Sequence, residues 1–103
     1  MIWTVVGFFK NGRTIAPNQL EDDLGGLSFE AEPTNAFDPN AVKVLLSGVH
    51  VAYVSRENAK EAKDFLATNT AYTVKVAQTF NASALVEVYA TPKNKSDPYW
   101  PID

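Results

Sequence analysis

The fold is decided by the stretch from residue 41 to residue 54, which reads Ala41-Val42-Lys43-Val44-Leu45-Leu46-Ser47-Gly48-Val49-His50-Val51-Ala52-Tyr53-Val54. β-Branched residues dominate both halves of this stretch, and the Ser47-Gly48 pair between them is a turn signal. We therefore expect an antiparallel hairpin with strands over 41–46 and 49–54 and a tight turn between them.

A helix is expected directly after the hairpin, from Arg56 to about Thr68. The apolar residues of this segment form one stripe, while charged residues fill the opposite face. The stripe consists of Ala59, Ala62, Phe65 and Leu66. Ser55 is placed to cap the start of the helix, and Asn69 is a suitable residue to end it.

Four further strands flank this unit, over residues 2–9, 27–32, 72–79 and 85–89. The Asn11-Gly12 pair predicts a turn after the first strand, and the segment up to Gly26 reads as a loop with one helical turn. The whole is a mostly β (α+β) arrangement of six short strands, with one main helix between strands four and five. We predict a small, closed or nearly closed six-stranded β-barrel over residues 1–91 and a tail over 92–103. An open sheet backed by the helix is the alternative.

Composition limits the functions that this chain can have. The 103 residues suffice for one domain, and the lack of cysteine excludes disulfides, thiolate metal sites and a cysteine nucleophile. No apolar run is long enough for a membrane span, so we expect a cytoplasmic protein without membrane contact. The net charge of −3 argues against a broad surface for polyanions, so a nucleic acid would have to be bound locally.

Catalytic chemistry has no evident place in the sequence. The only histidine, His50, lies within a strand, where we expect a surface residue rather than a base. The acidic trio Glu21-Asp22-Asp23 matches no calcium loop and is expected to form an acidic rim. We therefore expect no enzyme, no metal site and no cofactor.

One loop concentrates residues that suit binding. The segment reads Glu32-Pro33-Thr34-Asn35-Ala36-Phe37-Asp38-Pro39-Asn40-Ala41-Val42-Lys43-Val44, and it places an aromatic, an acid and two asparagines between two strands. A purely structural interpretation is also open: Asp38 could cap the backbone near Asn40, and Phe37 could plug the barrel end.

The same segment resembles the HIRAN domain family. Two further blocks carry the resemblance, namely Val6-Gly7 and the run Val51-Ala52-Tyr53-Val54-Ser55-Arg56-Glu57-Asn58-Ala59, where a strand enters a helix. The resemblance implies a HIRAN β-barrel related to the oligonucleotide-binding (OB) fold. It also implies binding of single-stranded DNA at its free 3′ end, with a helicase or nuclease as a partner protein.

The resemblance implies site residues as well. The family's aromatic that stacks on the terminal base corresponds to Phe37, and the acid that hydrogen-bonds the 3′-hydroxyl corresponds to Asp38. The basic residue that meets a backbone phosphate at the helix start corresponds to Arg56, and Tyr53 holds the neighbouring groove position. The contacts from the end of the first strand are matched loosely by Phe9 and Lys10, because better studied members carry an arginine and tyrosines there.

Phe80, in the last turn, is similar in position to a further stacking aromatic of the family. The acidic balance, the changed first strand and the tail aromatics Tyr99 and Trp100 favour an alternative function, a protein-interaction adaptor that keeps the fold without the DNA-end site.

Overall fold

The computed structural model describes residues 1–22, 26–69 and 71–91. Its elements are β1 (Ile2–Val6), the 3-10 helix η1 (Pro17–Asp22), β2 (Leu27–Ala31), β3 (Val42–Leu46), β4 (Val49–Val54), α1 (Arg56–Thr68), β5 (Tyr72–Thr79) and β6 (Ala84–Ala90). The predicted hairpin, helix and fifth strand lie where the sequence placed them. The side chains of the acidic trio and the tail 92–103, with Tyr99 and Trp100, lie outside the described residues.

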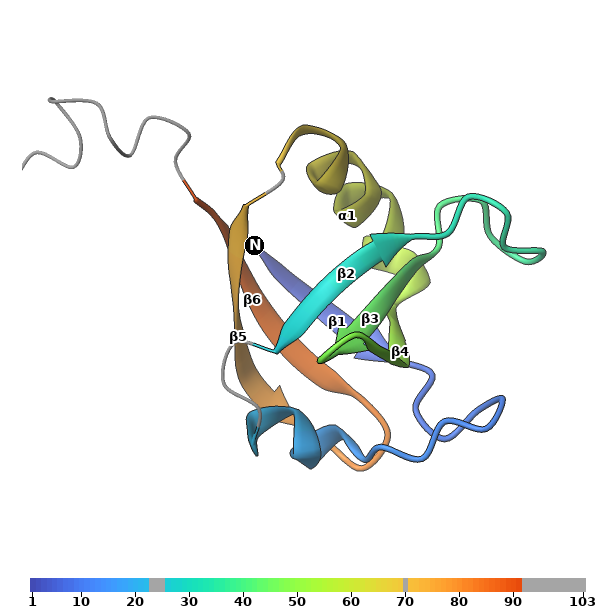
Figure 1. The fold of residues 1–103 in the computed structure, drawn as a ribbon, viewed down its shortest axis with the longest axis vertical. Helices are drawn as coiled ribbons and strands as arrows, with labels where there is room; N and C mark the ends of the chain where they lie inside the picture. Colours follow the sequence, from blue (N-terminus) through green and yellow to red (C-terminus); the bar gives the residue numbers. More distant parts are fainter. Residues whose placement is uncertain (23–25, 70, 92–103) are drawn as a thin grey trace, which may run out of the picture.

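The six strands form one antiparallel sheet in the order β2-β3-β4-β1-β6-β5. The sheet curls until its edge strands β2 and β5 approach each other, as Figure 1 shows. Across this opening the backbone N–H of Phe29 donates to the Tyr72 hydroxyl at 2.9 Å, and the two ring centroids lie 5.7 Å apart. The predicted small OB-like barrel with one main helix is confirmed, in a partly open form rather than as a flat sheet.

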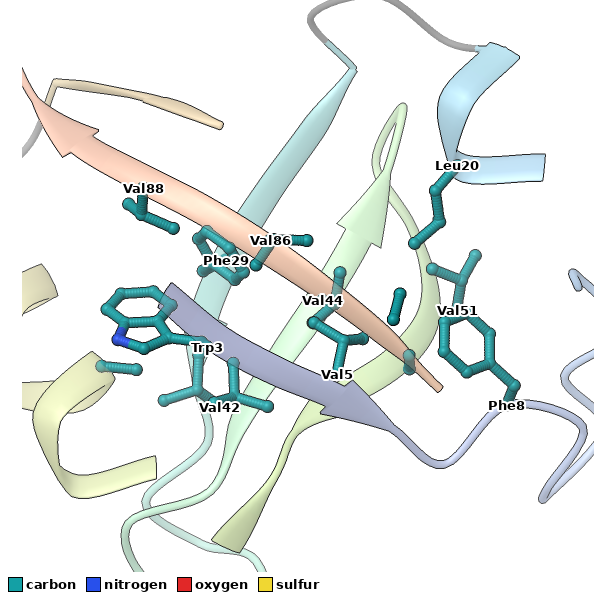
Figure 2. Close-up of a cluster of buried hydrophobic side chains, with 14 of the residues drawn as sticks. Trp3, Val5, Phe8, Leu20, Phe29, Val42, Val44, Val51, Val86 and Val88 are labelled. Carbon is teal, nitrogen blue, oxygen red and sulfur yellow. The ribbon is translucent and has the colours of Figure 1, made fainter. Parts of the chain in front are cut away.

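The core fills the inside of the curl. Trp3 of β1 is fully buried and meets the rings of Phe29 and Phe65 edge-on, with centroids 5.2 Å and 5.7 Å away. Such edge-to-face packing suits the aromatic quadrupole. Figure 2 shows a second group at the other end of the core, where Leu20 of η1 meets Phe8 and Val51. The helix α1 and the 3-10 helix η1 thus pack against the two ends of one continuous core.

The first strand is shorter than predicted. β1 ends at Val6 because Gly7 and Phe9 adopt positive φ angles of 82° and 64°, which ends the extended backbone. As a result Phe8 turns into the core with 4% exposure, while Phe9 faces outward with 54%. The predicted turn at Asn11-Gly12 is confirmed by its positive φ angles of 53° and 83°.

Candidate functional site

Two loops extend from the same side of the barrel (Figure 1): residues 7–16 after β1, and residues 32–41 between β2 and β3. Both contribute to a groove of about 410 Å³. The groove is lined by Val6, Gly7, Lys10, Asn11, Arg13, Asn35, Phe37, Asp38, Ala41, Tyr53, Val54 and Arg56. Three of these side chains are cationic and one is a carboxylate, so the lining carries +2 within a chain whose net charge is −3.

The loop 32–41 is held in shape by its own side chains. The Asn35 Nδ2–H donates to Glu32 Oε1 at 2.7 Å, while Asn35 Oδ1 accepts from the backbone N–H groups of Phe37 and Asp38 at 2.8 Å and 3.0 Å. The backbone pair between Glu32 and Ala41 closes the base of the loop at 2.8 Å. A loop fixed in this way presents its side chains without a large ordering cost on binding.

Phe37 and Asp38 differ in how the loop uses them. Asp38 Oδ1 accepts from the Asn40 N–H at 2.8 Å, so the turn-capping role of this carboxylate is real. Asp38 Oδ2 lies 4.0 Å from Arg56 Nε. Phe37 is 86% exposed, so the idea that it plugs the barrel end is wrong. The loop thus offers an aromatic face to solvent beside a carboxylate with one oxygen free of the turn.

Tyr53 lines the groove and is held in place through its hydroxyl group. Its hydroxyl donates to Glu32 Oε1 at 2.7 Å, and burial together with this partner raises the pKa of the Tyr53 phenol. Hydrogen bonds from Asn35 and Tyr53, and the Lys43 ammonium 3.5 Å from Oε2, hold the pKa of Glu32 below its ordinary value. Glu32 therefore joins Tyr53 of β4 to the loop that carries Phe37.

His50 is not the surface residue that the sequence suggested. It packs edge-on against the Tyr53 ring, with centroids 4.7 Å apart, and its Nε2 is buried without a hydrogen-bond partner among the described residues. Burial lowers the pKa of His50, and the nearby Arg13 charge lowers it further. His50 is therefore a neutral packing partner of Tyr53.

The start of α1 supplies Arg56, whose side chain is 78% exposed. The predicted Ser55 side-chain cap is wrong, because Ser55 Oγ donates instead to Asn58 Oδ1 at 3.1 Å. Asn58 Oδ1 also accepts from the Thr4 N–H at 2.9 Å, so one carbonyl oxygen joins β1 to the start of α1. The first turn of the helix thus keeps backbone donors that no side chain caps.

The remaining predicted residues are placed differently. Lys10 is exposed and lines the groove, whereas Phe9 is exposed but is not part of the lining. Phe80 lies in a separate depression with Pro17 and Asn18. Within the described ranges, no cluster of three or more potential metal ligands occurs, and no helix is long and apolar enough to cross a membrane.

Sequence reasoning missed Arg13, and it gave no individual role to Glu32 or Asn35, although both lie in the quoted segment 32–44. Arg13 lies in the groove because the turn at Asn11-Gly12, closed by the Arg13 N–H bonding the Lys10 carbonyl at 3.0 Å, returns the chain toward β1. The turn signal between two cationic residues was present in the sequence. The local sequence could not show that Gly7 and Tyr53 lie next to the Arg13 guanidinium.

The architecture is similar to that of a solved domain. No family model matches the sequence, and no curated protein matches it. The crystal structure of the HIRAN domain of human HLTF superposes with a TM-score of 0.60, at 16% sequence identity, over 93% of this chain and 79% of that chain. The fold is HIRAN-like. Because the likeness to the HIRAN domain covers nearly the whole chain, it concerns the arrangement of the barrel and not only a local motif.

Proposed function

We propose that this chain binds the free 3′-hydroxyl end of single-stranded DNA in the groove between its two loops, and that it catalyses no reaction. The observation that carries the proposal is the pairing of Phe37, 86% exposed, with Asp38, whose side chain is 20% exposed and whose Oδ2 lies on the Arg56 side. The resemblance of residues 32–44 to HIRAN domains supports the same conclusion, and the HIRAN-like fold supports it independently of the motif.

Each residue has a distinct role in this proposal. Phe37 stacks on the terminal base, which is worth about 1–3 kcal/mol for any base. Asp38 Oδ2 accepts a hydrogen bond from the terminal hydroxyl, and an internal nucleotide offers no such donor. Arg56, with the uncapped N–H groups of the helix start, meets a phosphate. Its 4.0 Å pairing with Asp38 is loose and exposed, so a phosphate can displace it at small cost.

The proposal is tested by NMR titration with two short strands of one sequence, one ending in a 3′-hydroxyl and the other in a 3′-phosphate. We expect amide shifts at Phe37, Asp38 and Arg56 with the hydroxyl strand and at least tenfold weaker binding of the phosphate strand, because the Asp38 carboxylate repels the added charge. No response to either strand at millimolar concentration would reject DNA binding at this groove.

Asp38→Asn separates the two roles of Asp38. Asparagine keeps an oxygen that can accept from the Asn40 N–H, so the turn and the fold are retained. We expect affinity for the hydroxyl strand to fall by about tenfold or more, since a hydrogen bond to a charged group is worth about 1.5–3 kcal/mol. Preference over the phosphate strand should disappear in the same titrations. An unchanged preference would remove Asp38 from the recognition of the strand end.

A protein-interaction adaptor is the second candidate, and the exposed Phe37 favours it because aromatic anchors also dominate protein interfaces. The discriminating measurement is capture of cellular partners before and after nuclease treatment. A partner whose capture requires Phe37 and survives nuclease supports the adaptor, whereas loss of capture with nuclease supports DNA.

A further inference from the structure

The fold fixes the position of Arg13 at the groove. The chain leaves β1 at Gly7, turns at residues 10–13, and returns so that Arg13 Nε donates to the Gly7 carbonyl at 2.8 Å. Its guanidinium carbon lies over the Tyr53 ring, 5.3 Å from the centroid. Tyr53 is itself immobilised, by its hydroxyl bond to Glu32 at 2.7 Å and by the edge of His50. The guanidinium is therefore held between a carbonyl and an aromatic ring.

This anchoring leaves the outer part of the guanidinium available. The Gly7 carbonyl accepts from Nε alone, so this hydrogen bond does not involve the N–H groups of the two terminal nitrogens. The described residues offer Arg13 no carboxylate within 4.0 Å, in contrast to Arg56, which lies near Asp38. A planar fork of donors, positioned beforehand and without an acidic partner among the described residues, matches the geometry of a phosphate.

We propose that Arg13 binds an internal phosphodiester of the strand, upstream of the phosphate at Arg56. The inference rests on the proposed function and adds to it a second phosphate subsite. Lys10, which begins the same turn and lines the same groove, lies exposed beside this subsite. Because Arg13 covers the Tyr53 ring, Tyr53 acts here as a support for the guanidinium.

A second phosphate subsite is occupied only by a ligand that carries more than one phosphate. A nucleoside 5′-monophosphate carries the terminal base, the 3′-hydroxyl and one phosphate, so it satisfies Phe37, Asp38 and Arg56 without reaching Arg13. A trinucleotide has two phosphodiesters, so it adds one upstream of the phosphate at Arg56. Arg13 should therefore contribute to the affinity for the trinucleotide and contribute nothing to the affinity for the monophosphate.

The experiment measures affinities of the wild type, Arg13→Gln, Arg13→Lys and Lys60→Gln for both ligands, each with a free 3′-hydroxyl. Lys60→Gln is the matched charge control, because Lys60 is exposed on α1, pairs with Asp64 and does not line the groove. We expect Arg13→Gln to weaken trinucleotide binding by about tenfold or more, to leave monophosphate binding unchanged, and to reduce the salt slope by about one. Arg13→Lys should restore only part of the loss, because lysine lacks the fork.

A second measurement alters the ligand and guards against an indirect effect through Tyr53. Replacing the upstream phosphodiester of the trinucleotide by a neutral methylphosphonate should weaken wild-type binding, and that loss should vanish in Arg13→Gln. Equal losses for Arg13→Gln and Lys60→Gln, or equal methylphosphonate losses in the wild type and Arg13→Gln, would overturn the inference about Arg13 alone. Failure of the wild type to bind either ligand would instead reject the proposed function.

Discussion

Phe37 and Asp38 are neighbours in sequence, but the Phe37 side chain is exposed whereas the Asp38 side chain is half-buried. Asn35 accepts from both of their N–H groups, which fixes the backbone and turns the Phe37 ring outward while Asp38 bonds to Asn40. An aromatic ring that is 86% exposed stabilises the fold little, since burial is the source of hydrophobic stabilisation. Burial in the core therefore does not explain its placement.

The exposure of Phe37 allows stacking to be tested apart from stability. Phe37→Ala should weaken DNA-end binding by about 1–3 kcal/mol and leave the melting temperature within about 2 °C of the wild type. Phe37→Leu is the matched variant, because it keeps an apolar side chain without a π face and should lose nearly as much affinity. Leucine binding as tightly as phenylalanine would show that the contact is not stacking.

His50 is a residue whose burial predicts a pH dependence of stability. Its pKa lies below the ordinary value of 6.5, so the unfolded chain takes up a proton that the folded chain resists. The free energy of unfolding should therefore decrease as the pH falls below 6.5. In His50→Phe, which keeps an edge to pack on Tyr53, denaturant unfolding between pH 7 and pH 5 should show a flatter profile. Parallel profiles for the two proteins would mean that His50 titrates normally when folded.

At the scale of elements, Glu32 connects strand β4 to the loop between β2 and β3. It accepts from Tyr53 and Asn35, and it pairs with Lys43. The pKa of this carboxyl is held below 4.5, so its contribution to stability is present above pH 4.5 and is lost as the pH falls below that value. This window lies below that of His50, so the two effects can be separated.

Glu32→Gln tests this connection. We expect a loss of about 1.5–3 kcal/mol of stability at pH 7, the contribution of a hydrogen bond to a charged group. The difference from the wild type should shrink at pH 3, and the amide signals of Phe37 and Asp38 should shift because the loop loosens. Equal unfolding free energies at pH 7, with unmoved loop signals, would show that the loop is held without Glu32.

At the scale of the whole molecule, the barrel is held closed partly by side chains. The edge strands β2 and β5 meet through the Tyr72 hydroxyl, which accepts from the Phe29 N–H at 2.9 Å, and through packing of the two rings. The buried face of this seam continues into the core around Trp3, so the seam and the core share side chains.

Tyr72→Phe should therefore destabilise the barrel by about 1–2 kcal/mol, because it leaves the Phe29 N–H without its partner. Hydrogen exchange at the Phe29 amide should accelerate in the same variant. Tyr89→Phe is the matched control: its hydroxyl bonds Glu87 on the exposed surface, and its loss should change stability by less than about 0.5 kcal/mol. Equal effects of the two substitutions would show that the seam does not hold the sheet closed.

The sequence by itself determined the hairpin, the limits of α1, the fifth strand and the turn at Asn11-Gly12. These features depend on residues close together in the chain, through strand alternation, a helical stripe and the preference of particular residues for positive φ. The resemblance of residues 32–44 also pointed to the loop that carries Phe37 and Asp38. The first strand was predicted too long, because its apolar residues continue past the point where Gly7 and Phe9 turn the backbone.

Only the tertiary structure decided what the groove contains. Arg13 meets Tyr53 across 40 positions of sequence, and Phe29 meets Tyr72 across 43. Such contacts follow from the curl of the sheet and from the order of its strands, which no local pattern encodes. The same holds for Ser55, whose hydroxyl suits a helix cap but donates to the Asn58 carbonyl oxygen, which also accepts from the Thr4 N–H of β1. Local chemistry fixes which elements form, and the packing of distant elements fixes which side chains share a site.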